Sequence, residues 1–173
     1  EYYAQFAAEH EDESETLAAE WENIAAAMAT ASMLEAWTLL LAFGKSLTRF
    51  WFQQAHFSHA RQGLRLIYPA AEALGDQGAL AFVTHKLGEA CLEQDDYLEA
   101  NQWLEKSLAL YVTQNDERGC AEIHYLLARM AVERADYPLA QMHIARYRRF
   151  CEEMLESNGL GKAYYLEAIV AYF

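Results

Sequence analysis

A glycine, a lysine and a hydroxyl residue stand together at Gly44-Lys45-Ser46, the order in which a phosphate-binding loop ends. Such a loop follows a strand, wraps backbone N–H groups around phosphates and needs a further glycine five residues before its second one. Leu39 occupies that position, and residues 39–43 resemble the interior of a helix. We therefore expect no nucleotide site within this chain.

Two pairs of side chains have a spacing that could share a metal ion, namely His56 with His59 and Cys120 with His124. A structural zinc site needs four protein ligands and a catalytic site three, and no third ligand stands near either pair in the sequence. No Ser/His/Asp or Cys/His arrangement can be defended, and the GxSxG motif is absent. We expect no metal site, no cofactor and no catalysis.

The composition favours a globular domain with a hydrophobic core. The chain has 173 residues, of which 54% are hydrophobic and only two are proline, so a disordered or linker class is excluded. No apolar run approaches the roughly 18 residues that a membrane-spanning helix requires. Three cysteines without a CxxC pair are typical of reduced thiols, which predicts a cytoplasmic location without membrane contact.

Acidic charge is concentrated near the start of the chain. Residues 1–44 contain nine acids and neither lysine nor arginine, and the net charge of the whole chain is −13. Nucleic-acid affinity depends largely on lysine and arginine that neutralise phosphates. The charge therefore argues against direct nucleic-acid binding.

A sequence pattern recurs at intervals of 40 residues. Its columns hold an aromatic residue, an alanine, a leucine, a small residue after that leucine, and a further aliphatic residue. The column members are Phe57, Tyr97 and Tyr137; Ala60, Ala100 and Ala140; Leu47, Leu87 and Leu127; Thr48, Gly88 and Ala128; and Leu64, Leu104 and Ile144. Such a period indicates a tandem structural repeat.

Each repeat has the apolar spacing of two helices. We expect first helices over about 33–54, 77–94, 117–134 and 161–173, and second helices over about 57–74, 97–114 and 137–157. Asp96 and Asp136 stand where a carboxylate can accept hydrogen bonds from the first turn of the second helix, and Pro138 is tolerated in that turn. Pro69 predicts a kink or an early turn, and the small residues predict close helix crossings.

These columns, for example Leu87-Gly88 with Tyr97 and Ala100, resemble the tetratricopeptide repeat, although this unit is longer than the usual ~34 residues. The chain lacks the family's aromatic residue early in the first helix, where Thr84 and His124 stand, and its closing proline. The resemblance implies an all-α, right-handed superhelix (α-solenoid) with a period of about 40 residues. N-terminal capping or linker helices occupy 1–32, and repeats occupy 33–173, divided into about 33–75, 76–114, 115–158 and a partial 159–173.

A second resemblance concerns the segment 17–27, which has the pattern Leu-x-x-Glu-x-x-Asn-hydrophobic-x-x-Ala and is followed by Phe50-Trp51. It is similar to the stretch that joins the nucleotide-binding module to the repeats in bacterial STAND-type (NB-ARC-type) signalling ATPases and transcriptional regulators. The resemblance implies a regulatory or sensor arm, with an ATPase module upstream of Glu1. A free-standing scaffold or peptide receptor is the alternative reading, and it predicts the same fold.

The first helices of tetratricopeptide arrays line a concave groove, and the resemblance places eleven residues there. They are Lys45, Arg49, Phe52, Phe82, His85, Glu89, Glu122, Tyr125, Arg129, Lys162 and Tyr165. Such a mixture of charged and aromatic side chains could hold a protein, a peptide or a small effector, or could form a solvated face whose aromatic residues are buried by stacking. Arg146, Arg148 and Arg149 form a basic cluster on a second helix, where solvation or contact with a neighbouring domain is the favoured role.

The pattern stays apolar up to Tyr172-Phe173. A terminal repeat that exposes its apolar side needs a cap. We therefore expect either further repeats in the parent protein or self-association through the terminal repeat.

Overall fold

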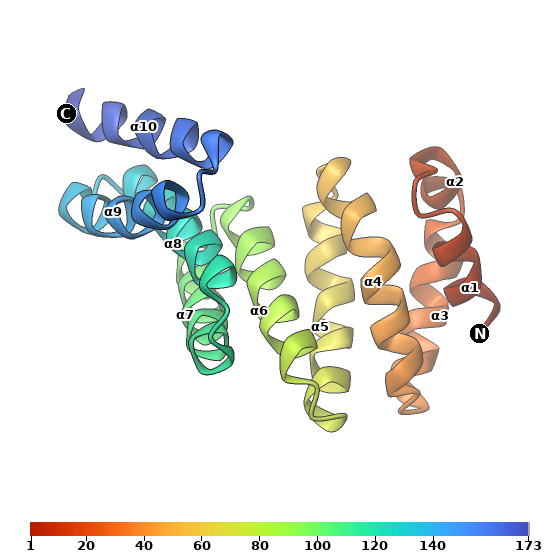
Figure 1. Cartoon of the computed structure of the whole chain (residues 1–173). Helices are drawn as coiled ribbons and strands as arrows, with labels where there is room; N and C mark the ends of the chain where they lie inside the picture. The colour runs from red at the N-terminus through yellow and green to blue at the C-terminus, as the bar shows by residue number, and fades with distance from the viewer. Residues whose placement is uncertain (173) are drawn as a thin grey trace. The chain divides into compact units, whose positions relative to one another are not determined.

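The protein is all helical over residues 1–172, which are the residues that the computed structural model describes (Figure 1). The predicted all-α class is confirmed, and Phe173 of the predicted last repeat lies outside the described residues. The helices are α1 (Tyr2–Glu9), α2 (Ser14–Ala19), α3 (Trp21–Met33), α4 (Trp37–Gln53), α5 (Phe57–Ala73), α6 (Gln77–Leu92), α7 (Tyr97–Gln114), α8 (Glu117–Glu133), α9 (Tyr137–Glu153) and α10 (Ser157–Tyr172).

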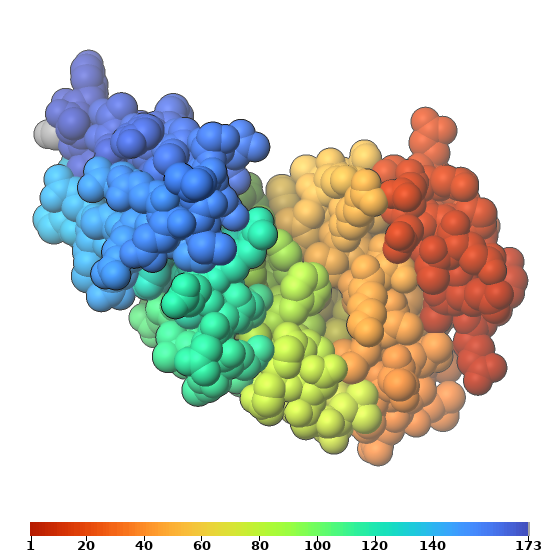
Figure 2. Space-filling model, viewed as in Figure 1, coloured from red at the N-terminus to blue at the C-terminus, as the bar shows by residue number. Residues whose placement is uncertain are grey.

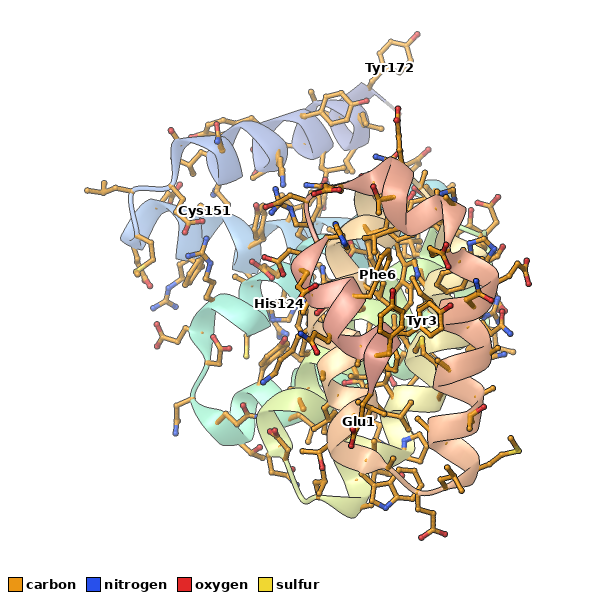
Figure 3. All side chains as sticks on the ribbon, turned by 90° about the vertical axis from the view of Figure 1, so that its right-hand side faces the viewer. Glu1, Tyr3, Phe6, His124, Cys151 and Tyr172 are labelled. Atoms are coloured by element: carbon orange, nitrogen blue, oxygen red, sulfur yellow. The ribbon has the colours of Figure 1, made fainter. Side chains whose placement is uncertain are left out.

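The helices form two compact units, one over residues 1–100 and one that begins at Asn101. In the first unit α5 packs between α4 and α6, and α1 and α3 pack against α4. Figure 2 shows the red N-terminal segment lying against the orange surface of this unit. In the second unit α9 packs against both α8 and α10. Consecutive helices are therefore the main packing partners within each unit.

Small side chains lie where consecutive helices pack. Ala60, Ala100 and Ala140 are fully buried, as are Gly88 and Ala128 of the other small column. Residues of this size let two helix backbones approach closely. The large side chains of the first core, by contrast, come mainly from one face of α4 and include Leu40, Phe43, Leu47, Phe50 and Trp51.

One type of turn joins the helices from α3 onward. A residue with positive φ occurs every twenty residues, at Glu35, Ala55, Gly75, Asp95, Asn115, Ala135 and Leu155. At Gly75 the glycine N–H donates to the Glu72 carbonyl at 3.1 Å and the next N–H, of Asp76, donates to the Ala71 carbonyl at 3.1 Å. This bond pair defines the Schellman motif, which satisfies carbonyls at the end of a helix. The same pair recurs at each of these turns.

The residue after each positive φ precedes the first residue of the next helix. The Asp136 carboxylate accepts from the Leu139 N–H at 3.2 Å, and that of Asp96 accepts from the Glu99 N–H at 3.2 Å. Both predicted caps are confirmed, and Asp76 caps α6 in the same way through the Ala79 N–H at 2.9 Å. Each turn thus ends one helix and starts the next without an intervening loop.

Three helix boundaries differ from those expected. The helix expected from residue 33 begins at Trp37, because Glu35 adopts positive φ and the Ala36 N–H bonds the Ala31 carbonyl. The helix expected from residue 161 begins at Ser157, because Leu155 makes the same turn, which also ends α9 at Glu153 rather than 157. An early turn at Pro69 was one of two expectations, and α5 instead continues to Ala73.

The turns provide a matched pair of substitutions with opposite expected effects. An alanine at positive φ is strained by its Cβ, and this strain amounts to about 1 kcal/mol. We expect Gly75→Ala to lower the free energy of unfolding by about 1 kcal/mol although no atom lies within 4 Å of the added Cβ. Ala55→Gly removes the same strain and should raise the free energy of unfolding by a slightly smaller amount. Urea denaturation measures both, and two changes of equal sign would contradict the strain argument.

Candidate binding surfaces

The candidate phosphate loop is a helix. Residues 44–46 lie inside α4, with Gly44 and Ser46 buried, and Leu39 belongs to the same helix. This confirms the expected helix interior before the glycine. Gly44 faces α5, where an added Cβ would lie 3.1 Å from the Ile67 Cδ1 atom.

The α4 residues predicted to line a groove have different environments. Lys45 and Arg49 are exposed, whereas Phe52 is half-buried. Arg49 forms an ion pair with Asp12, from the link between α1 and α2. The Phe52 ring packs edge-on against Phe57, with ring centroids 5.8 Å apart. Of the two α4 cations, only Lys45 lacks an ion pair among the described residues.

The α6 members of the predicted groove lie at different depths. Phe82 is 37% exposed, but His85 is only 4% exposed and belongs to the core. Glu89 accepts a hydrogen bond from Lys86 Nζ at 2.7 Å, and the same Nζ lies 5.0 Å from the centre of the Phe52 ring. Lys86 therefore joins α6 to α4, a role that sequence reasoning missed because the groove columns did not include it.

Burial changes the acid–base properties of His85. Its pKa is lowered to about 3, first by burial and then by the charge of Lys86. The Glu89 carboxylate lies 3.9 Å from His85 Nε2 and would favour the protonated ring. It is nevertheless already paired with Lys86, so burial dominates. The imidazole is neutral at pH 7.

The groove residues of the second unit include one close pair. Lys162 Nζ lies 5.0 Å from the centre of the Tyr125 ring, a cation–π arrangement between α10 and α8. Arg129 Nη2 lies 3.7 Å from the Glu133 carboxylate. Tyr165 is 67% exposed.

Glu122 completes the predicted set. Its carboxylate lies 3.7 Å from Arg118 Nε. The eleven predicted residues divide between the two units, with six in the first and five in the second. The two groups therefore belong to separate units.

A cavity of about 350 Å³ lies between α4 and α6. Lys45 of α4, Ile67 of α5 and Phe82 of α6 all line it. Its walls are mostly carbon, apart from Lys45 and the capping residue Asp76. The structure thus brings two predicted groove residues to one hollow of small-molecule size.

A second cavity, of about 380 Å³, lies where α8 and α9 meet the end of α7. Its lining includes Cys120 and His124, the pair whose spacing alone could share a metal ion, together with Arg146 and Arg149. Arg148 of the predicted basic cluster instead bonds the Glu167 carboxylate of α10 at 2.7 Å. Arg148 therefore bonds to α10, whereas Arg146 and Arg149 line the cavity.

His124 contacts a partner that sequence spacing did not suggest. Its Nδ1 atom lies 3.1 Å from Nδ1 of His143, which comes from α9. Burial, His143 and Arg146 lower the pKa of His124 to about 4, and burial also lowers the pKa of His143. Within residues 1–172 no group of three or more His, Cys, Asp or Glu side chains could hold a metal ion. The neutral pair joins α8 to α9.

The remaining candidate reactive side chains, His56, His59 and Cys91, pack against neighbouring residues. The His59 ring stacks on the Trp21 ring with centroids 4.5 Å apart, and the centroids of the His56 and His59 rings lie 5.4 Å apart. Burial raises the pKa of the Cys91 thiol to about 12, so it is a weak nucleophile at neutral pH.

None of the helices in the described part of the chain combines the length and apolar character needed to cross a membrane. No family model, curated protein or solved structure matches the chain.

Proposed function

We propose that this chain is a non-catalytic, tetratricopeptide-like repeat domain that binds an effector or a protein partner along the faces of its first helices. The observation that carries this proposal is the cavity between α4 and α6, which Lys45 and Phe82 of the predicted groove line together. A mostly apolar hollow with a few polar groups at its edge is the usual form of a ligand site.

The proposed architecture is a right-handed α-solenoid with a period of about 40 residues, or two helices. The same Schellman turn every twenty residues supports it, because identical joints between helices of similar length favour a regular stack. Stacked repeats bury a continuous core and leave an extended surface for binding.

In the parent protein the domain would act as the regulatory arm of a cytoplasmic STAND-type ATPase. An effector that binds two conformations with different affinity shifts the equilibrium between them, and the coupling equals that difference in binding free energy. The Leu-x-x-Glu-x-x-Asn pattern in 17–27 supports this assignment. Residues 21–27 of that pattern lie in α3, whose Ile24 is fully buried.

The groove is tested by charge reversal with a defined probe. A fluorescent peptide of alternating glutamate and phenylalanine, which the basic and aromatic groove residues should hold, is titrated against the full chain and followed by anisotropy. We expect Arg49→Glu and Arg129→Glu each to weaken binding about tenfold, close to 1.4 kcal/mol.

Arg134→Glu is the matched control, because Arg134 is exposed and no ion pair with a described residue involves it. It should leave the affinity unchanged. Equal affinity of the wild type and both groove variants would remove the groove from the proposal.

A further inference from the structure

Two residues without side chains, Gly44 and Gly78, belong to the lining of the cavity between α4 and α6. At Gly44 an added Cβ would reach Ile67 of α5 at 3.1 Å, so the backbone of α4 lies close to that side chain. At Gly78 an added Cβ would meet only the Asp76 Oδ1 atom, at 3.5 Å. The space in front of Gly78 is therefore free for a ligand.

The rest of the lining defines an apolar site. Leu41 of α4 and Ile67 of α5 face the cavity together with Phe82 and Val83 of α6. Phe82 is 37% exposed, although its neighbour Val83 is buried. A partly exposed aromatic ring beside an apolar hollow adds contact area for the hydrocarbon part of a ligand.

The positive charge of Lys45 at this cavity determines which polar group a ligand should have. Lys45 is exposed and forms no ion pair with a described residue. Asp76, the other charged residue of the lining, accepts the Ala79 N–H and so caps α6. An ammonium that forms no ion pair at an apolar cavity favours an anion whose remaining atoms are apolar.

We infer that this cavity binds a small carboxylate with an apolar body, with the carboxylate at Lys45 and the hydrocarbon between Ile67 and Phe82. The volume of about 350 Å³ is near the lower end of the range for small-molecule pockets, so a short acid such as octanoate is the appropriate probe. This inference names the effector class for the first-unit half of the proposed groove and rests on that proposed function.

The test compares three probes of equal chain length by isothermal titration calorimetry on the full 173-residue chain. Octanoate should bind at least tenfold more tightly than octanol or octylamine, because only octanoate has both the apolar body and the negative charge. Equal binding of octanoate and octanol would overturn the assignment of the carboxylate to Lys45, as would tighter binding of octylamine.

Two variants locate the site. Lys45→Met keeps a side chain of similar length without the charge and should weaken octanoate binding about tenfold while leaving octanol binding unchanged. Gly78→Leu places a side chain in the open space and should abolish octanoate binding. Gly161→Leu is the matched control, because an added Cβ at Gly161 of α10, outside the cavity, meets nothing within 4 Å. Full octanoate affinity in Gly78→Leu would place the ligand elsewhere and overturn the inference.

The acidic peptide separates the two proposals. A chain that binds the peptide, with the predicted loss in Arg49→Glu, but binds no octanoate contradicts this inference alone. A chain that binds octanoate at the Lys45 cavity, while the arginine variants leave peptide binding unchanged, contradicts the extended groove alone. Thermal unfolding of each variant confirms that it is folded under the conditions of the titration.

Discussion

Replacing Gly63 by alanine is expected to lower the free energy of unfolding by about 3 kcal/mol. The added Cβ would lie 2.4 Å from Cη2 and 2.7 Å from Cζ2 of the Trp51 ring. Contacts this short require one partner to move. Gly63 lies in α5 and Trp51 in α4, so the clash would separate the two helices.

The Trp51 ring has little freedom to move. It is fully buried and packs edge-on against Trp21, with ring centroids 5.9 Å apart. Met28 of α3 also lies 3.3 Å from the position of the new Cβ. Because protein cores are closely packed, displacement of a large ring affects several helices.

Urea denaturation of Gly63→Ala measures the effect, with Gly78→Ala as the matched control in the same unit. The control places its Cβ 3.5 Å from the nearest atom and should be neutral or slightly stabilising. In the Gly63→Ala background, Trp51→Phe should recover part of the lost stability, and a double-mutant cycle gives the interaction energy. A change of less than 0.5 kcal/mol in Gly63→Ala would show that α4 and α5 adjust freely, contrary to this account.

Acidification is expected to destabilise the first unit through His85. Burial lowers the pKa of the folded-state imidazole to about 3, while the unfolded chain has a histidine pKa near 6.5. The unfolded state therefore binds the proton first. The stability from the neutral ring is complete above about pH 6.5 and is lost as the pH falls toward 3, at a rate of up to about 1.4 kcal/mol per pH unit.

The measurement compares the pH dependence of the free energy of unfolding in the wild type and in His85→Gln. Glutamine cannot titrate, so its curve should be flatter than that of the wild type between pH 6.5 and 4.5. At pH 7.5 the variant should be the less stable of the two, because it alters a packed site. Parallel curves over this range would show that His85 is not protonated on unfolding, and the burial argument would then fail.

The helices of this protein could be predicted from sequence because their signals are local. Apolar spacing along each helix and the caps at Asp96 and Asp136 need no knowledge of distant residues. The helix boundaries that were predicted wrongly lie at two turns without a sequence signal. Glu35 and Leu155 adopt positive φ without being glycine or asparagine, the residues that normally signal this turn.

The candidate sites were less predictable because they depend on packing between helices. The alignment of repeat positions placed His85 in the groove. The burial of a side chain depends on the helices packed against it, and His85 lies in the core. The same limit hid the contact of His124 with His143, which are on different helices. Lys45 and Phe82, both predicted groove residues, line one surface cavity between α4 and α6.

The seven Schellman turns also restrict how the chain can change in length. The last residue of each turn immediately precedes the first residue of the next helix, so the turns contain no additional loop residues. One residue inserted within a helix would rotate everything beyond it by about 100° and turn buried side chains outward. Because the sequence pattern recurs every forty residues, or two helices, insertions and deletions should be tolerated mainly as whole pairs of helices.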